Sequence, residues 1–243
     1  MTATSSTTVT PGTLYLIPVP LGPGEASDVI PQRAAKILDQ ISIILAEDER
    51  SARRAIRLMA PDVPVAKFKI ERLNEHTQPH EIKGLLQPLV SGESVGVISE
   101  AGCPGVADPG ALVVREAHRI GARVVPLVGP SSILLALMAS GLNGQRFSFV
   151  GYLPKEKGLR CQEIVKLEKK VQESKESQIF IETPYRNLAL FQDLLLSCRA
   201  ETSLCVACAI NTADEYIETH PISEWRKRSF EIPKEPCTFI LGV

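Results

Sequence analysis

Short apolar segments alternate with amphipathic ones along the first part of the chain. Four segments, 14–19, 41–46, 94–99 and 123–128, are almost continuously apolar. A strand of a parallel sheet is covered by helices on both faces, so continuous rather than alternating hydrophobicity indicates such a sheet. Helical patterns fill the stretches between these strands, at 31–40, 49–59, 81–90 and 109–120. This order predicts an N-terminal α/β domain with a doubly wound, mostly parallel sheet over residues 13–144.

The pattern changes after about residue 145. Four segments favour strands, at 147–153, 178–182, 204–210 and 238–243, and the helical segments between them, 159–172 and 185–196, are longer and more charged. We therefore expect a second, α+β domain over 145–243, joined through a linker within 141–145. Small and polar residues at the start predict a disordered tail over 1–12.

The composition is that of an ordinary globular protein. Of 243 residues, 44% are hydrophobic and 23% charged, and 27 Lys and Arg stand against 28 Asp and Glu. This balance excludes binding to nucleic acid or lipid by bulk positive charge alone, although a local basic patch stays open. No apolar run approaches the ~20 residues of a membrane span. No Lys or Arg precedes Arg33, so the charged start of a secretory leader is missing and we expect a cytoplasmic protein.

Six cysteines are spread through the chain. They stand at positions 103, 161, 198, 205, 208 and 237. Without an export signal, this pattern fits reduced thiols better than a disulfide framework. Cys205 and Cys208 have CxxC spacing, but positions i and i+3 of a strand face opposite sides. We expect buried apolar thiols there and no metal site.

Three loops that follow the predicted strands are unusually rich in Gly, Pro and Ser. They span 18–24, 100–110 and 129–132, and the longest carries Asp108 near its end, a residue suited to cap the next helix. Each loop alone is ordinary turn chemistry. Because ligands of open α/β sheets bind outside the carboxyl ends of the strands, the three together indicate a binding crevice. The prolines of 18–24 lack the backbone amides that a dinucleotide needs, which disfavours a dehydrogenase.

Charged residues follow the second predicted strand. After Glu47 and Asp48, a helical segment places arginines at i, i+3, i+4 and i+7, namely Arg50, Arg53, Arg54 and Arg57. This stripe is either a phosphate contact or a solvated surface. His76 and His80 are four residues apart, but Pro79 interrupts the helix that would align them, so a loop at a substrate cleft is favoured over a metal site. The basic residues of 155–175 are nearly balanced by acids and predict a solvated helix face.

The sequence carries six motifs in a fixed order. They are Pro20-Leu21-Gly22-Pro23, Glu47-Asp48-Glu49-Arg50, the segment from Ser99 to Gly110, Val128-Gly129-Pro130-Ser131, Gly151-Tyr152-Leu153-Pro154 and Glu182-Thr183-Pro184-Tyr185-Arg186. In this order they resemble the tetrapyrrole methylase superfamily of S-adenosylmethionine (SAM) methyltransferases. Within it they are most similar to the branch that methylates a cytidine ribose 2′-hydroxyl in small-subunit ribosomal RNA.

The resemblance implies a two-domain tetrapyrrole-methylase-like fold, a homodimer, and SAM bound in the cleft between the domains. By position, it assigns SAM contacts to ten residues: Leu21, Gly22, Ala101, Gly102, Cys103, Val106, Ser131, Ser132, Ile181 and Glu182. Methyl transfer of this kind depends largely on positioning, which can supply about 7 to 11 kcal/mol of the barrier. No metal is implied.

A hydroxyl acceptor must also lose its proton, and the nearby carboxylates of Glu47, Asp48 and Glu100 are the candidate bases. The candidate substrate-binding residues are Arg50, Arg53, Arg54, His76 and Arg186. Substrate-side positions depart from the branch pattern, with Pro23 for Asn, Glu49 for Thr and Glu100 for Asp. From the resemblance as a whole we expect a SAM-dependent methyltransferase of ribosomal RNA. A SAM-dependent methyltransferase of a tetrapyrrole or other small acceptor, and a non-catalytic SAM-binding module, are the alternatives.

Overall fold

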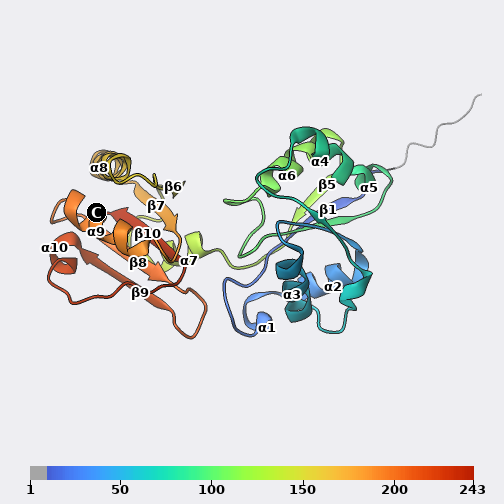
Figure 1. The fold of residues 1–243 in the computed structure, drawn as a ribbon, viewed down its shortest axis with the longest axis horizontal. Helices are drawn as coiled ribbons and strands as arrows, with labels where there is room; N and C mark the ends of the chain where they lie inside the picture. Colours follow the sequence, from blue (N-terminus) through green and yellow to red (C-terminus); the bar gives the residue numbers. More distant parts are fainter. Residues whose placement is uncertain (1–9) are drawn as a thin grey trace, which may run out of the picture. The chain divides into compact units, whose positions relative to one another are not determined.

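The chain forms two compact units in a computed structural model that describes residues 10–243 (Figure 1). The predicted tail over 1–12 falls largely on residues 1–9, which lie outside the described residues. The division between the units lies after Pro130, whereas the sequence places a boundary after residue 144. Each unit contains one five-stranded sheet with helices on it.

The first unit is built on a parallel sheet with the strand order β3-β2-β4-β1-β5. Its strands are β1 (Thr13–Ile17), β2 (Ile43–Ala46), β3 (Lys69–Arg72), β4 (Val95–Ile98) and β5 (Arg123–Pro126). Every residue of β2 and β4 is buried, which confirms the parallel sheet expected from their continuous hydrophobicity. β3 escapes the sequence pattern because it is an edge strand, where polar side chains reach water.

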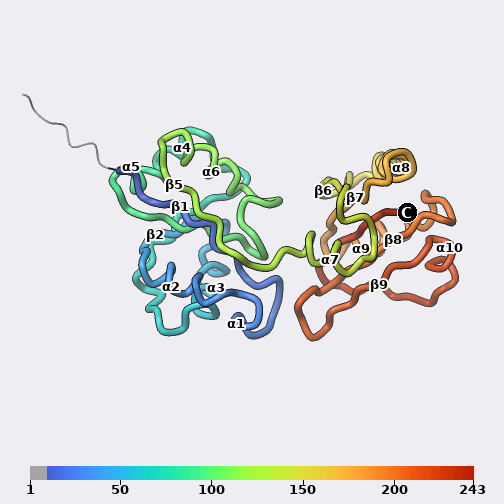
Figure 2. Tube along the Cα trace, turned by 180° about the vertical axis from the view of Figure 1, so that it is seen from behind, coloured from blue at the N-terminus to red at the C-terminus, as the bar shows by residue number. Residues whose placement is uncertain are grey.

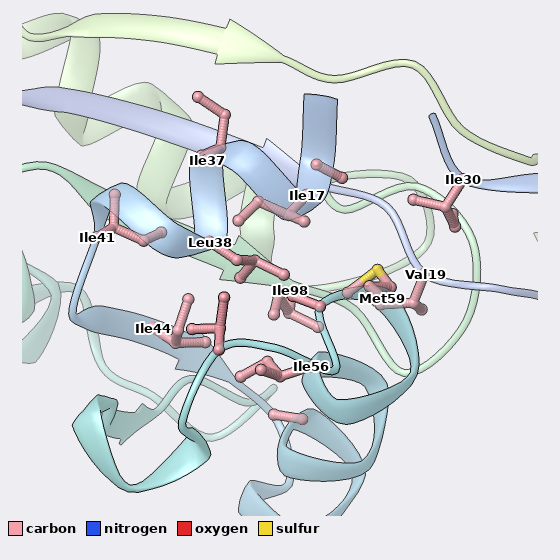
Figure 3. Packing of buried hydrophobic residues seen from close by; sticks show 14 of the residues in the cluster. Ile17, Val19, Ile30, Ile37, Leu38, Ile41, Ile44, Ile56, Met59 and Ile98 are labelled. Atoms are coloured by element: carbon pink, nitrogen blue, oxygen red, sulfur yellow. The ribbon is translucent and has the colours of Figure 1, made fainter. Parts of the chain in front are cut away.

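Helices cover both faces of this sheet (Figures 1 and 2). On one face lie α1 (Ala26–Val29), α2 (Gln32–Gln40) and α3 (Glu49–Met59); on the other lie α4 (Pro79–Leu85), α5 (Gln87–Val90) and α6 (Gly110–Arg119). Ile44 packs with Leu38 and Ile56 in the first core (Figure 3). Its neighbour Leu45 belongs to the opposite core with Val113. Successive strand residues thus enter two different cores, which is why β2 is apolar throughout.

The second unit has a mixed sheet with the order β6-β7-β10-β8-β9. Its strands are β6 (Phe147–Tyr152), β7 (Ser177–Glu182), β8 (Ser203–Cys208), β9 (Tyr216–Pro221) and β10 (Cys237–Gly242). Only β6 and β7 pair in parallel, and the other pairs are antiparallel. This architecture confirms the expected α+β organisation.

One face of the second sheet packs against α8 (Lys157–Ser174), α9 (Asn187–Ser197) and α10 (Ile222–Trp225). There Phe180 stacks on Phe239 with ring centroids 5.8 Å apart. The helix α7 (Ser132–Ser140) contacts β8, β9 and β10, and Leu142, just after it, lies against Gly242 on the opposite face from Phe239. Because α7 packs on this sheet, the unit begins near Ser131 rather than at 145.

The cysteine pattern differs from the sequence expectation. Cys208 and Cys237 form a disulfide, so the expectation of reduced thiols is wrong for this pair. The two residues stand directly opposite each other on the antiparallel strands β8 and β10, with Cα atoms 4.2 Å apart. Cys205 is buried and free, as expected. The pair is hidden in the sequence because β9 separates its members by 29 residues.

The helix α8 also corrects the sequence expectation of a solvated face. Arg160 is 6% exposed, and its Nη2 lies 2.6 Å from Asp193 Oδ2. The same guanidinium donates to the carbonyls of Pro154 and Lys155. Glu168 is buried as well and accepts a hydrogen bond from the Thr202 hydroxyl. Two charges of this helix are therefore interior anchors. Over residues 10–243, the helices lack the combination of length and apolar content that a membrane span requires.

Candidate functional site

The strand order of the first unit determines where a crevice can open. The loop after β4 leads to α6 on one face of the sheet, whereas the loops after its neighbours β1 and β2 lead to α1 and α3 on the other face. Ligands of open α/β sheets bind where neighbouring connections leave in opposite directions. The carboxyl ends of β1, β2 and β4 therefore form the candidate site of this unit.

The loops after β1 and β4 are joined by backbone hydrogen bonds. The Val19 amide donates to the Gly102 carbonyl at 3.0 Å, and the Gly102 amide returns a bond of 3.1 Å. Gly102 has a φ of +69°, and a Cβ there would lie 3.1 Å from Leu21 Cδ2. The Cys103 thiol donates to the Pro130 carbonyl of the loop after β5 at 3.3 Å. Three of the residues assigned to SAM by resemblance, Leu21, Gly102 and Cys103, thus lie on loops that contact one another.

The remaining first-unit residues assigned to SAM are carried by the same loops. Gly22 is half-buried, and Ala101 and Val106 are exposed. The third loop packs closely on the first, because a Cβ at Gly129 would lie 2.2 Å from Pro18 Cγ. Glycine is therefore required at this position for the two loops to meet.

Asp108 anchors the long loop from inside. Its Oδ1 accepts hydrogen bonds from the Gly105 amide at 2.6 Å and the Gly110 amide at 2.8 Å. Burial raises the pKa of this carboxyl. The sequence suggests Asp108 only as a helix cap. In the structure Pro109, not Asp108, is the N-cap of α6, so that expectation is wrong. The bonds from Gly105 and Gly110 show that Asp108 instead shapes the loop before the helix.

The three candidate bases have different environments: Glu47 is half-buried, whereas Asp48 and Glu100 are exposed. The pKa of Glu47, at the end of β2, is raised by burial first and then by the charges of Glu100, Asp108 and Glu75. Asp48 caps α3 and accepts the Ser51 amide at 2.8 Å, and this bond lowers its pKa. A general base is most effective when its pKa approaches the working pH, so Glu47 suits the role better than Asp48. Residues 10–243 hold no group of three or more His, Cys, Asp or Glu placed to bind a metal.

The arginine stripe of α3 is only partly free. Arg53 pairs with Glu49 through Nε at 2.8 Å and donates to the Val65 carbonyl at 3.1 Å, next to the short 3-10 turn η1 (Val65–Lys67). Arg53 therefore fixes α3 to the segment that follows it. The other three members of the stripe, Arg50, Arg54 and Arg57, are exposed and remain available to a ligand.

The histidines are separated by a helix start. His76 is exposed in the loop between β3 and α4, and Pro79 is the first residue of α4, so His80 falls in the first turn of that helix. The nearest acid to His76 is Glu75, 3.6 Å away. Pro79 begins the helix rather than interrupting it, and the two imidazoles lie on different elements.

The second unit carries the remaining predicted site residues. Ser131 occupies the N-cap position of α7 and Ser132 is its first residue. Ile181 and Glu182 end β7. The Glu182 side chain is fully buried; its Oε1 accepts the Thr183 amide at 2.8 Å.

Arg186 is engaged inside the second unit. Its Nη2 lies 2.7 Å from Glu182 Oε2 and donates to the Leu153 carbonyl at 3.0 Å. The arginine therefore ties the end of β7 to the end of β6. The sequence suggests a substrate contact at Arg186 and does not reveal this bracing role, because the contact with Leu153 joins residues 33 positions apart.

Comparison with known proteins gives one family and one fold. The sequence profile described as "Tetrapyrrole (Corrin/Porphyrin) Methylases" matches residues 13–225. "Ribosomal RNA small subunit methyltransferase I" of Pseudomonas aeruginosa is 32% identical over 213 residues, which cover 88% of this chain and 71% of that protein. The protein of the same name from Bacillus subtilis is 34% identical over 175 residues, which cover 72% of this chain and 56% of that protein.

Solved structures agree on the fold. The methyltransferase CobJ matches with a TM-score of 0.61 at 19% identity, over 95% of this chain and 92% of that chain. Uroporphyrin-III C-methyl transferase from Thermus thermophilus, complexed with S-adenyl homocysteine, matches with a TM-score of 0.57 at 19% identity, over 95% and 97% of the two chains. At this identity the likeness establishes the arrangement of strands and helices alone.

Proposed function

Since the chain belongs to the tetrapyrrole (corrin/porphyrin) methylase family, it is a SAM-dependent methyltransferase, and we propose that its acceptor is a ribose 2′-hydroxyl of small-subunit ribosomal RNA. The name shared by its bacterial relatives supports the acceptor. The single observation that carries the chemistry is the carboxyl of Glu47, whose pKa is raised at the edge of the sheet where the Gly- and Pro-rich loops meet.

The residues at this edge fit SAM. The loops offer main-chain groups and small side chains. At Gly102 the backbone is left-handed, and the Pro130 carbonyl oxygen would lie only 3.2 Å from an added Cβ, so a larger residue has no room there. We assign the holding of SAM in this unit to Leu21, Gly22, Gly102 and Cys103. When bound, SAM supplies a methyl group activated by a sulfonium.

Glu47 then acts as the general base. A ribose hydroxyl must lose its proton as it is methylated, and an ionised carboxylate can accept that proton. Burial, and after it the charges of the surrounding acids, raise the pKa of Glu47 and so make it a stronger base once it is ionised. Asp48 stays committed to the cap of α3, and Asp108 to the shape of the long loop.

The exposed arginines of α3 supply the contact to the RNA backbone. Arg50, Arg54 and Arg57 follow Glu47 directly along the chain and lie on one helix. Guanidinium groups bind phosphates through charge-assisted, often bidentate hydrogen bonds. A net charge of -1 for the whole chain is compatible with this, because the positive charge is gathered locally.

We also propose a homodimer. Leu134 and Met138, one turn apart on α7, are 51% and 79% exposed, and Phe147 is 40% exposed. Exposed apolar side chains of this size are typical of an interaction surface. An rRNA substrate would place the protein in the cytoplasm.

The proposed activity is tested by separating SAM binding from methyl transfer. Calorimetric titration with SAM is followed by transfer of a radiolabelled methyl group to small ribosomal subunits from an undermethylated strain. We expect the combined variant R50Q/R54Q/R57Q to lose RNA methylation while its affinity for SAM is unchanged. The matched control is K166Q/K169Q/K170Q on α8, whose lysines are exposed; it should keep both properties.

Two outcomes contradict the proposed acceptor. Transfer to a small molecule such as a tetrapyrrole, without transfer to RNA, would favour the small-acceptor enzyme. SAM binding without transfer to any cell fraction would favour a non-catalytic module.

A further inference from the structure

An open cavity of about 260 Å³ lies at the carboxyl end of β3. Its lining residues are Arg72, Asn74, His76, Thr77, Glu81 and Leu85. Small-molecule sites usually measure about 300 to 1,000 Å³. The cavity is therefore suited to one small unit of a longer molecule, rather than to a complete cofactor such as SAM.

The strand that carries the cavity lies next to the strand that leads to the candidate catalytic carboxylate, Glu47. β3 pairs with β2, and the Leu73 amide donates to the Ala46 carbonyl at 2.8 Å, immediately before Glu47. The charge of Glu75, in the loop that forms the cavity, acts on the carboxyl of Glu47. A group held in the cavity would thus lie beside Glu47 on the side of β2 that faces β3, away from β4 and its loop.

The lining supplies a free cation and free donors. Among residues 10–243, the guanidinium of Arg72 has no ion pair and no hydrogen-bond partner, in contrast to Lys69 on the same strand, which pairs with Glu71. The Asn74 Oδ1 accepts the His76 amide at 3.0 Å, and the side-chain NH₂ of Asn74 has no hydrogen-bond acceptor within the described part of the chain. These donors suit a phosphate and the polar edge of a base.

The other walls suit a ring. The imidazole of His76 and the apolar side chain of Leu85 line the same cavity. The carboxylate of Glu81 is already engaged, since its Oε2 accepts the Gln78 amide at 2.6 Å. Single-stranded RNA is recognised by stacking of splayed bases on His and aromatic rings, together with Arg and Lys contacts to the backbone.

We propose that this cavity binds one nucleotide of single-stranded RNA that neighbours the methylated one, with its phosphate on Arg72 and its base against His76 and Leu85. The inference rests on the proposed function and adds to it a site that sets the register of the strand. By holding the neighbouring nucleotide, the cavity places the acceptor ribose at Glu47.

The test compares two matched pairs of variants in the full-length protein. The control for R72Q is R33Q, because Arg33 is an exposed arginine of α2. The control for H76A is H80A, because His80 is an exposed histidine of α4 that does not line the cavity. We expect R72Q to raise the KM for RNA at least tenfold, with little change in kcat. It should also reduce the slope of a plot of log K for RNA binding against log salt concentration by about 1, as expected for the loss of one phosphate contact. R33Q and H80A should behave as the wild type, and all four should keep the wild-type affinity for SAM and the wild-type unfolding temperature.

Binding is measured separately from transfer, so that the two proposals can fail independently. A fluorescent RNA oligonucleotide spanning the methylated site is titrated into each variant, with free CMP as the comparison. Tighter binding of the oligonucleotide than of CMP, weakened by R72Q and H76A, supports the cavity even in a protein that transfers no methyl group to RNA. If the wild type methylates RNA while R72Q and H76A keep the wild-type KM and oligonucleotide affinity, the cavity proposal is overturned and the proposed function stands.

Discussion

The two units differ in what surrounds their buried acids. In the first unit, Glu47 is half-buried with Glu100, Asp108 and Glu75 as its charged neighbours, and its pKa is raised. In the second unit, Asp193 and Glu182 are more deeply buried, yet each lies next to an arginine, at 2.6 Å and 2.7 Å.

This difference separates chemistry from scaffolding. A carboxylate with like charges around it holds its proton more readily and can exchange it near the working pH. A buried carboxylate paired with arginine has its charge compensated, and removal of the arginine leaves a buried charge without that partner. In the first unit, Glu47 is therefore a reactive group that lowers the stability of the fold. In the second unit, the charged pairs hold loops in place.

The largest effect is expected from E47Q in the first unit. Loss of a general base lowers the rate of methyl transfer by about 10² to 10⁴. The effect of E47Q on the stability of the fold is expected to have the opposite sign to its effect on the rate. Because the pKa of Glu47 is raised in the folded state, its stabilising effect is complete below its unfolded pKa and is lost as the pH rises through the folded value. At neutral pH, E47Q should unfold no earlier than the wild type.

The measurements are methyl transfer under saturating SAM and thermal unfolding at two pH values. E49Q is the control, because Glu49 is an exposed neighbour that pairs with Arg53 and is not among the charges that act on Glu47. Wild-type activity in E47Q would remove Glu47 from the mechanism.

The second unit should respond to R160M with a large loss of stability. Asp193 would remain buried with only the exposed Lys157, 3.8 Å away, as a charged partner, and the carbonyls of Pro154 and Lys155 would lose their donor. Breaking such a pair costs about 3 to 5 kcal/mol. Adding D193L should restore part of the loss. The control K169Q, on the same helix as Arg160, breaks an exposed pair with Glu173 and should cost far less.

Urea unfolding followed by tryptophan fluorescence reports on this unit, because Trp225, the single tryptophan, packs in its core. Equal losses in R160M and K169Q would show that Arg160 does not stabilise the second unit more than a surface residue does.

The disulfide of the second unit has the next effect. Its members are 29 residues apart, and for a loop of this length the chain-entropy estimate gives about 3 to 4 kcal/mol of stabilisation. Reduction should lower the free energy of unfolding of the second unit by this amount, which is measured as a lower urea midpoint. Alkylation of the unfolded, unreduced protein should label four cysteines, and six after reduction. Labelling of all six without reductant would contradict the bond.

The degree of burial of each element, and the distance along the chain to its partners, explain how much of the fold could be predicted from the sequence. β2 and β4 were predictable because burial on both faces leaves an uninterrupted apolar run. β3 and β9 are edge strands of mixed polarity, and such strands have no equally clear pattern. In the second unit, burial of Arg160 depends on a partner 33 residues away, which a run of charges cannot reveal.

The candidate site was predictable to a similar extent. The Gly- and Pro-rich loops and Glu47 lie at strand ends, where the sequence directs attention. Which carboxylate is perturbed depends on neighbours that follow two other strands: for Glu47 these are Glu75 after β3, and Glu100 and Asp108 after β4. The cavity around Arg72 is not predictable from the sequence, because β3, the strand that carries it, has no continuous apolar run.

The smallest expected effect is a shift in the pH dependence of kcat/KM in E100Q. It is also the sharpest test of the comparison between the carboxylates of the two units. The charge of Glu100 is the largest electrostatic contribution to the raised pKa of Glu47, after burial. Its removal should lower that pKa, so that Glu47 ionises earlier as the pH rises. The acid limb of the profile of kcat/KM against pH should therefore move to lower pH, while E25Q, at an exposed position outside this group, leaves it unmoved. If E100Q instead abolished transfer at every pH, Glu100 would be the base and Glu47 its modulator, and the raised pKa would mark the neighbour of the catalytic group.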